Sequence, residues 1–239
     1  MKAAVYMGTR NVYEDMIPAI KSLLCNSDVD RIYALIEDDK MDCYLPDCVN
    51  VVNVSKQRWF KKSGPNYKSH WTWMILMRGA YPIMFEKFDT IVGLDNDAII
   101  VGDVSDLFEV DLEDNYIAGV IEPAKSKETP YINMGVCVYN LKKLREDGTC
   151  KKIMVDLNTV PHYACEQDAY NFICAGKIKV LPPCYNINNY TQNSGETKIR
   201  HFAAEKGWQS KPLVGKYRRM PWTEVEKRHA EAISQRRSR

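Results

Sequence analysis

Residues 90–101 read Thr90-Ile91-Val92-Gly93-Leu94-Asp95-Asn96-Asp97-Ala98-Ile99-Ile100-Val101. The run before Asp95 is nearly continuously apolar and rich in β-branched residues, which is typical of a strand buried on both faces of an α/β sheet. Two carboxylates at the end of such a strand need a partner, because a buried, unpaired charge costs several kcal/mol. Ligands of open α/β sheets bind at the carboxyl ends of strands, where Asp95 and Asp97 can hold a divalent cation and the cation a diphosphate. An ordinary strand-to-turn junction is the alternative interpretation.

Strand and helix patterns alternate along the rest of the chain. Strand patterns cover residues 2–7, 31–36, 49–54, 90–94, 116–121, 133–140, 177–181 and 198–203, and helical patterns cover 14–25, 69–85, 141–147, 150–157, 166–175 and 223–235. Strands separated by helices of this length predict an α/β fold with a mostly parallel, Rossmann-like sheet and helices on both faces.

The length of the chain predicts one large domain, or a domain with a modest appendage. At 239 residues, 45% of them hydrophobic, the chain is long enough for one sizeable core and has no low-complexity stretch. A net charge of +2 does not by itself indicate a polyanionic partner. From Lys216 onward, however, eight Lys and Arg residues face three Glu residues. We therefore expect a main domain over 1–212 and a basic helical tail over 213–239, most simply a solvated helix. Docking on an anionic membrane surface and binding to nucleic acid are the alternatives.

The termini and the cysteines bear on location. The apolar start of the chain is too short for a secretory segment, and no apolar run approaches the ~18 residues of a membrane span. The eight cysteines contain no Cys-x-x-Cys pair and no zinc-finger spacing. We therefore expect a cytoplasmic protein with reduced thiols. Contact with the inner membrane face is the alternative that the basic tail allows.

Five further segments place polar residues at strand ends or helix starts: the turn 7–13, the helix 71–85 with the single cation Arg78, the strand 131–140, the helix start 165–171 and the segment 199–208 with His201. Each has an ordinary explanation. Acidic residues, for example, favour a helix N-terminus by ~0.3–1 kcal/mol, and a lone histidine is more often structural than a ligand. A metal held by two aspartates usually needs a third protein ligand, and His201 directly follows a short strand.

Taken in order, these segments resemble the retaining glycosyltransferases of family 8, the group of glycogenin, galactinol synthase and bacterial lipooligosaccharide galactosyltransferases. The resemblance runs from the first strand to about Trp208. It is strongest where an apolar run, Asp-x-Asp, a second apolar run and a Leu-Phe helix follow one another, the last as Asp106-Leu107-Phe108. Arg78 stands at the family's usual distance before Asp95.

The resemblance implies a GT-A fold that binds a nucleotide sugar, most often a UDP-sugar. The resemblance matches the nucleoside contacts to Met7, Thr9 and Tyr13, and the ribose contact to Asn96. The metal ligands match Asp95, Asp97 and His201, and the diphosphate contact matches Lys206. The contacts to the donor sugar match Arg78, Asn133, Gly135, Gln167 and Asp168. The family's Lys-Pro-Trp reads Lys206-Gly207-Trp208 here, and its Asn-Ala-Gly reads Asn133-Met134-Gly135. The stretch between Asp97 and Asn133 is short compared with members that close a long acceptor loop over the site.

The implied reaction is transfer of a hexose with retention at the anomeric carbon. Two carboxylates and an imidazole favour Mn²⁺ over Mg²⁺ as the metal. Arg78 and Lys206 would add positive charge near the diphosphate. Gln167 and Asp168 stand where a nucleophile would be, but an amide is a poor nucleophile. We therefore favour attack on the face from which the diphosphate departs, with Gln167 and Asp168 holding the sugar.

Two other classes of protein fit parts of the pattern. A non-catalytic nucleotide-sugar-binding protein would keep the nucleoside loop and lose a metal ligand. A sugar-nucleotide nucleotidyltransferase would carry a Gly-rich, basic loop after the first strand, of which Gly8-Thr9-Arg10-Asn11 is a thin version. No nucleic-acid motif is present. For the acceptor, the sequence leaves a glycan, a lipid-linked glycan, a protein, a small polyol and a modified base open, and it does not fix the oligomeric state.

Overall fold

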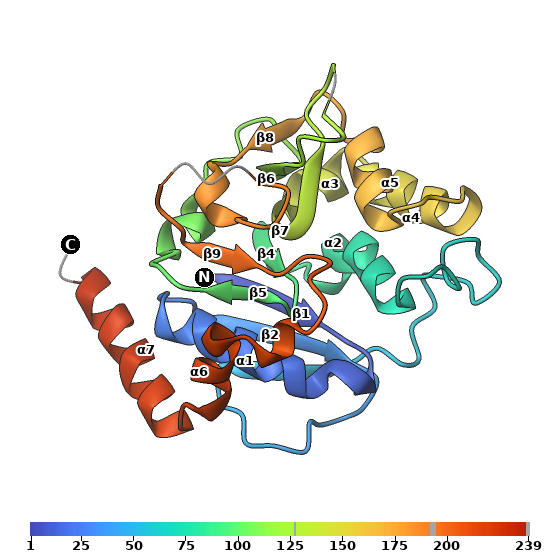
Figure 1. Cartoon of the computed structure of the whole chain (residues 1–239). Coiled ribbons are helices and arrows are strands. Elements are labelled where there is room, and N and C mark those ends of the chain that lie inside the picture. The colour runs from blue at the N-terminus through green and yellow to red at the C-terminus, as the bar shows by residue number, and fades with distance from the viewer. Residues whose placement is uncertain (127, 192–194, 238–239) are drawn as a thin grey trace.

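Seven strands form the main sheet within residues 1–126, 128–191 and 195–237, the parts of the chain that this computed structural model describes. Their order in the sheet is β3-β2-β1-β4-β7-β6-β8 (Figure 1). The strands are β1 (Ala3–Met7), β2 (Arg31–Ile36), β3 (Val49–Asn53), β4 (Thr90–Leu94), β6 (Ile117–Ile121), β7 (Ile132–Asn140) and β8 (Ile178–Val180).

The sheet is mixed, with a parallel half that is continuous. Strands β3, β2, β1 and β4 pair in parallel, β7 pairs antiparallel with both β4 and β6, and β8 returns parallel to β6. This arrangement confirms the expected α/β, Rossmann-like sheet. Because β1 and β4 are parallel neighbours, their carboxyl ends share one edge, which brings the turn after Met7 beside Asp95.

Strand β4 is buried on both faces, as its apolar run predicts. Val92 and Leu94 belong to one hydrophobic core, whereas Ile91 belongs to the core on the other side of the sheet. At Gly93 an added Cβ would lie 2.9 Å from the ring of Tyr139, so the absence of a side chain lets that ring pack against the strand.

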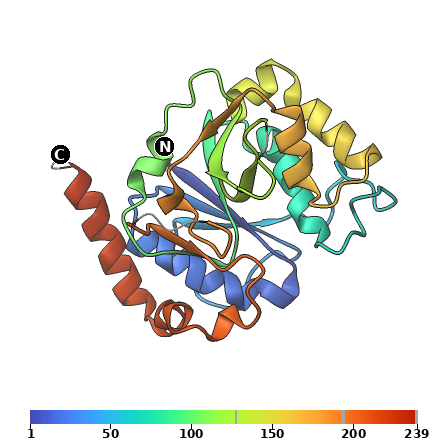
Figure 2. The same ribbon diagram turned by 45° about the horizontal axis from the view of Figure 1, so that its top comes forward.

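Helices cover both faces of the sheet (Figures 1 and 2). One core contains Ile20 and Leu23 of α1, and the other contains Met74 and Ile153. The helices with their bounds are α1 (Tyr13–Cys25), the 3₁₀ helix η2 (Trp73–Ala80), α2 (Tyr81–Met84), α3 (Leu141–Glu146), α4 (Thr149–Thr159), α5 (Glu166–Ile173), α6 (Pro212–Arg219) and α7 (Trp222–Arg237).

Three local features differ from the sequence-based expectation. The helix expected over 69–85 begins only at Trp73, as η2, and continues as the short α2. Its start is set by the Thr72 side chain, which accepts a hydrogen bond from the Met74 amide (3.3 Å). Helix α6 forms the first part of the expected helical tail, where the sequence pattern indicated a helix only over 223–235. The strand expected over 198–203 is β9 (Ile199–His201), but its partner β5 (Ala98–Ile100) and the separate two-stranded sheet that they form were not expected, because a strand of three residues carries almost no periodic signal.

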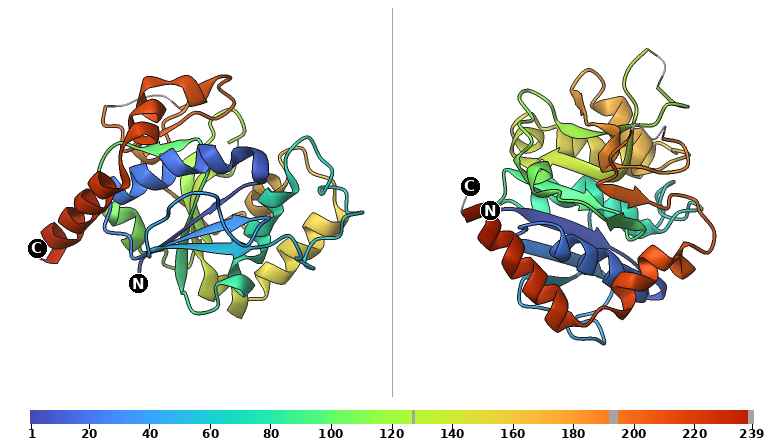
Figure 3. Two further views of the ribbon diagram at one scale, coloured as in Figure 1. Left: turned by 90° about the horizontal axis from the view of Figure 1, so that it is seen from below. Right: turned by 60° about the vertical axis from the view of Figure 1, so that its left-hand side comes forward.

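The tail helices α6 and α7 pack along α1. Val214 and Val225 are fully buried in the same core as α1, and the Lys21 ammonium donates to the Met220 carbonyl (2.6 Å). Near the end of α7, Arg236 pairs with Asp28 and Glu109. Figure 3 shows α7 on the side of the molecule away from α4 and α5. The tail therefore packs against the main core. The division into 1–212 and 213–239 stays a prediction.

Two further observations concern the whole chain. No helix in the described ranges combines the length and the hydropathy needed to cross a bilayer. All eight cysteines carry free thiols, and four of them are buried.

Candidate functional site

The predicted metal ligands converge at the carboxyl end of β4. Asp95 and Asp97 follow this strand directly, and antiparallel pairing of β5 with β9 sets His201 opposite Ala98. The Nε2 atom of His201 lies 3.1 Å from Asp97 Oδ1 and 3.6 Å from Asp95 Oδ2. One ligand atom from each of the three residues lies within 4.8 Å of the others. The structure thus brings Asp95, Asp97 and His201 together, and we call them the acidic cluster.

Gly135 makes room for the acidic cluster. A Cβ at this position would lie 2.2 Å from His201 Cε1 and 2.9 Å from Asp95 Oδ2, far inside normal contact distances. The Gly135 carbonyl also accepts a hydrogen bond from the Asp95 amide (2.8 Å), which fixes the turn after β4. Two carboxylates and an imidazole around a glycine form a ligand set that suits a divalent cation such as Mn²⁺.

Arg78 is a buried cation behind the cluster. Its guanidinium donates to Asp95 Oδ1 (2.5 Å) and to Glu166 Oε1 (2.6 Å), and only 2% of the residue is exposed. Burial opposes the charge, but Asp95 and Glu166 help to raise the pKa of Arg78 well above its ordinary value. Arg78 is therefore charged at any physiological pH, and it is a structural partner of Asp95.

The acidic groups respond differently to burial. Burial alone would raise the pKa of Asp95, but Arg78 and His201 outweigh it and lower that pKa. For Glu166, burial outweighs the attraction of Arg78 and raises the pKa to about 7. Burial would lower the pKa of His201, but Asp97 and Asp95 raise it. Asp95 is thus kept ionised by the positive charges of Arg78 and of protonated His201.

Three buried polar atoms around the cluster lack a hydrogen-bond partner among the described residues: Arg78 Nε, Asn96 Oδ1 and Glu166 Oε2. Buried polar groups are normally paired, and each unpaired one costs about 1–3 kcal/mol. Their gathering beside the acidic cluster fits a site that receives polar ligand atoms or water.

The donor-sugar residues of β7 and α5 meet at Glu122. The Gln167 side chain accepts from the Met134 amide (3.0 Å) and donates to Glu122 Oε2 (3.1 Å). The Asn133 side chain donates to the same oxygen (3.2 Å). Glu122 was not predicted as a site residue, because it follows β6 in a loop and becomes a neighbour only through the pairing of β6 with β7.

The Asp168 carboxylate is held by two protein donors, and its expected contact with the donor sugar stays a prediction. One of its oxygens accepts from the Ala164 amide (2.8 Å), and the other accepts a short hydrogen bond from the Tyr131 hydroxyl. Only 8% of the residue is exposed. Asp168 therefore holds the turn before α5, while the neighbouring Gln167 is the side chain linked to Asn133.

The predicted nucleoside residues lie in the turn between β1 and α1. The Asn96 amide donates to the Met7 carbonyl (2.8 Å) and so ties this turn to the acidic cluster. The Tyr13 hydroxyl accepts from the Glu37 amide (2.8 Å) and donates to Asp38 (3.0 Å) at the end of β2. Thr9 donates to Asn11 (2.6 Å) in the same turn. Lys206 is different: it is exposed in the turn after β9, and no hydrogen bond or ion pair recorded in the described residues joins it to the cluster.

A family model described as Glycosyl transferase family 8 matches residues 26–210. The chain belongs to glycosyltransferase family 8. It is 26% identical over 240 residues to glycosyltransferase GlyE of Streptococcus pneumoniae serotype 4, an alignment that covers 93% of this chain and 57% of GlyE. The chain therefore spans little more than half the length of this relative.

Solved structures of two glycosyltransferases have the same fold. The crystal structure of GlyE from Streptococcus pneumoniae matches with a TM-score of 0.72 at 20% identity, over 98% of this chain and 63% of that one. Galactosyltransferase LgtC, in complex with donor and acceptor sugar analogues, matches with a TM-score of 0.67 at 16% identity, over 93% of this chain and 99% of that one. These likenesses confirm the expected GT-A fold.

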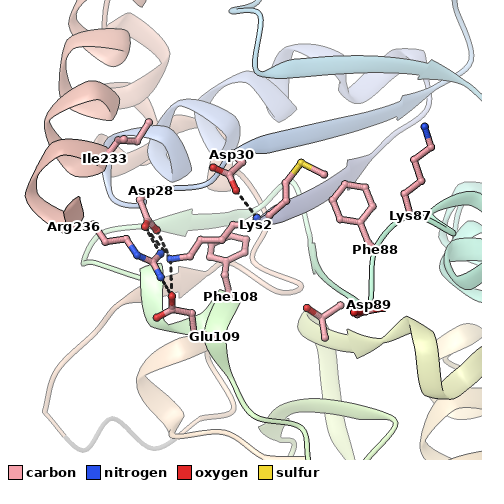
Figure 4. Close-up of a pocket in the computed structure, with 12 residues that line it drawn as sticks. Lys2, Asp28, Asp30, Lys87, Phe88, Asp89, Phe108, Glu109, Ile233 and Arg236 are labelled. Atoms are coloured by element: carbon pink, nitrogen blue, oxygen red, sulfur yellow. Dashed lines mark hydrogen bonds and ion pairs between the residues drawn. The ribbon is translucent and has the colours of Figure 1, made fainter. Parts of the chain in front are cut away.

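A cavity of about 580 Å³ lies at the edge of the sheet where β1 and β4 begin (Figure 4). It is bounded by Lys2 at the start of β1 and Thr90 at the start of β4, whereas the acidic cluster follows the end of β4. Its Lys2 and Arg236 side chains are paired with Asp28. The cavity therefore lies where α7 packs against the sheet, and it is not part of the acidic cluster.

Sequence reasoning missed Glu166, Glu122 and Asn186 as site residues. Glu166 lies in the predicted helix start and received only a general helix-terminus role. Asn186 is completely buried beside His201, in a segment where four asparagines occur within residues 186–193. That density of asparagine was the one available signal, and it does not say which of them faces a site.

Proposed function

We propose that this protein is a metal-dependent, retaining glycosyltransferase that moves a hexose from a nucleotide sugar, most simply a UDP-sugar, to a hydroxyl acceptor. The observation that carries the proposal is the convergence of Asp95, Asp97 and His201 at the carboxyl end of β4, in a chain of glycosyltransferase family 8. The acceptor supplies a hydroxyl group and belongs to one of the classes named above.

In this proposal Asp95, Asp97 and His201 hold the cation, and Mn²⁺ is favoured because one of the three ligands is an imidazole. When bound, the cation supplies positive charge to the donor diphosphate as the bond to the sugar breaks. Arg78 acts from behind, because its ion pair with Asp95 keeps that carboxylate ionised and oriented. Lys206 contributes a further positive charge from its exposed turn.

The remaining residues bind and orient the donor. Met7, Thr9, Tyr13 and Asn96 receive the nucleoside, and the ties from Asn96 to Met7 and from Tyr13 to the end of β2 hold that turn in place before the ligand arrives. A turn that is already ordered loses less conformational entropy when it binds.

The hexose is held by Asn133, Gly135 and Gln167. Gln167 is an amide whose oxygen and nitrogen both have protein partners, which suits it to orienting a sugar and not to attacking one. Asp168 supports the turn before α5, since its two oxygens accept from Ala164 and Tyr131. We therefore propose same-face transfer with retention, in which neither residue forms a bond to the sugar.

The test is release of UDP from a panel of UDP-sugars in Mn²⁺ buffer and in EDTA. One sugar donor should be hydrolysed slowly in Mn²⁺ and not in EDTA, and Asp97→Ala should abolish that turnover. Asp114→Ala, which changes an aspartate that is 74% exposed, is the matched control and should keep full activity. Wild-type activity in the purified Asp97→Ala protein would refute the metal-site assignment.

Two alternatives give different products in the same assay. UDP binding without turnover of any donor would favour a nucleotide-sugar-binding protein, and release of diphosphate from a nucleoside triphosphate would favour a nucleotidyltransferase.

A further inference from the structure

We infer that Asn186 is a positioning residue that fixes the ring of His201, so that the Nε2 lone pair of His201 faces Asp95 and Asp97. The inference rests on the proposed function, because it concerns how one proposed metal ligand is prepared. Asn186 lies outside the set of residues that the resemblance implied. Which groups donate and which accept along the hydrogen bonds from Glu122 through Asn133 and Asn186 to His201 follows from their neighbours.

Asn186 reaches His201 through the segment before β9. This segment runs alongside β9, with the His201 amide donating to the Ile187 carbonyl (2.9 Å) and the Ile187 amide donating to the Ile199 carbonyl (3.0 Å). The Asn186 side chain is fully buried, with Oδ1 2.8 Å from His201 Nδ1. On its other side, Asn186 Nδ2 donates to Asn133 Oδ1 (3.0 Å).

The orientation of the Asn133 amide follows from its neighbours. The Gly135 amide can only donate, and it lies 3.0 Å from Asn133 Oδ1. An ionised Glu122 carboxylate can only accept, and it lies 3.2 Å from Asn133 Nδ2. A flipped Asn133 would face donor with donor and acceptor with acceptor. Asn133 therefore points its side-chain oxygen at Asn186, and the NH₂ group of Asn186 must be the donor of the hydrogen bond between them.

The same logic then sets the histidine. With its NH₂ group toward Asn133, Asn186 turns its carbonyl oxygen toward His201 Nδ1, and only a protonated Nδ1 can bond to it. The Asn188 side chain donates to that oxygen as well (3.2 Å), which uses its second lone pair. When the imidazole is neutral, as a metal ligand has to be, it therefore carries its proton on Nδ1, and its free lone pair is on Nε2. A histidine ligand typically needs such an acceptor for its other N–H group.

The chain of bonds also joins the two halves of the proposed site. Glu122 Oε2, where the chain begins, accepts from Gln167 of α5 as well (3.1 Å). Residues proposed to hold the sugar and a residue proposed to hold the cation thus share one hydrogen-bond network, which runs from Gln167 through Glu122, Asn133 and Asn186 to His201. Loss of a partner of this kind commonly weakens metal binding by about 10–100-fold.

The test is calorimetric titration of the full chain with Mn²⁺ alone, without any sugar donor. Asn186→Leu removes the acceptor and should weaken Mn²⁺ binding by about 10–100-fold. Asn186→Asp keeps an acceptor for Nδ1 but loses the donor to Asn133 Oδ1, and should restore part of the binding that Asn186→Leu loses. Asn66→Leu changes an equally buried asparagine that bonds to Leu157 and Val160 instead, and should leave Mn²⁺ affinity unchanged.

The outcomes separate the two proposals. Equal affinities of wild type and Asn186→Leu would overturn the role of Asn186 and leave the metal site standing, as would an Asn186→Asp variant as weak as Asn186→Leu. Absence of Mn²⁺ binding by the folded wild type would overturn the metal site of the proposed function itself. If Asn186→Leu does not fold, long-range ¹H–¹⁵N spectra of the metal-free wild type, at a pH where His201 is neutral, decide, with His201→Gln assigning the signals. A proton on Nδ1 supports the inference, and a proton on Nε2 overturns it.

Discussion

Gly135 contributes to the site by having no side chain. Its Cα faces His201 and Asp95 so closely that any Cβ would displace one of them. Overpacking of this kind typically costs about 1–3 kcal/mol, which corresponds to roughly 5–150-fold in an equilibrium constant. Gly135→Ala should therefore weaken Mn²⁺ binding by about that factor, measured by calorimetry.

The control for this variant is Gly102→Ala. A Cβ at Gly102 would meet its nearest neighbour, Lys198, at an ordinary 3.4 Å, so this change should leave Mn²⁺ affinity unaltered. Unchanged Mn²⁺ affinity in Gly135→Ala would mean that the acidic cluster is not where the cation binds.

Glu166 should make stability depend on pH. Burial raises its pKa from the ordinary 4.5 to about 7 in the folded protein. The folded state therefore binds more protons than the unfolded state in this range, and the contribution of Glu166 to stability, fully present below pH 4.5, is lost as the pH rises through about 7. In Glu166→Gln, the urea-denaturation midpoint should therefore change less with pH between 4.5 and about 7 than it does in the wild type.

The comparison variant is Glu113→Gln, which changes a side chain that is 64% exposed and should keep the wild-type pH profile. If Glu166→Gln also keeps that profile, Glu166 is ionised throughout and its charge is fully compensated by Arg78.

At this scale, the sequence predicted the three members of the acidic cluster and the location of Gln167. It did not predict Asn186 or Glu122, because each is distant in sequence from its site partners and is brought to them by strand pairing. For Asp168 the sequence indicated the position and not the direction of the side chain, which is set by Tyr131 and the Ala164 amide.

Among the elements, the tail helix α7 offers a direct test of the domain division. Val225 is fully buried in the core that α1 shares. Removing two buried methyl groups costs about 2 kcal/mol or more. Val225→Ala should therefore lower the free energy of unfolding of the whole domain by that amount in a single transition, followed by tryptophan fluorescence in urea.

Lys227→Ala is the matched surface change, since the Lys227 side chain is 77% exposed on the same helix, and it should shift stability by less than about 0.5 kcal/mol. If Val225→Ala leaves the main unfolding transition where it was, the tail is an independent appendage, as the boundary at 212/213 would suggest.

The buried strands were the most predictable elements. β1, β2 and β4 are short apolar runs between polar residues, and their bounds agree with the sequence pattern to within one residue. Elements set by single contacts were not predictable. The start of η2 depends on the Thr72 cap, and β5 exists because β9 pairs with it.

In the molecule as a whole, the residues proposed to bind the nucleoside and the cation gather at one edge of the sheet because β1 and β4 are adjacent and parallel. The tail lies elsewhere, and several of its arginines are already paired: Arg218 with Asp15, Arg228 with Glu224, and Arg236 with Asp28. Such pairing fits the expectation of a solvated helix better than that of a membrane anchor, which would need its cations for lipid headgroups.

The central claim is that this edge binds a nucleoside diphosphate through a cation. Its most direct test is calorimetric titration of the protein with UDP, once in Mn²⁺ and once in EDTA. We predict binding in Mn²⁺ that is lost in EDTA. Equal binding in both buffers, or none in either, would contradict the claim.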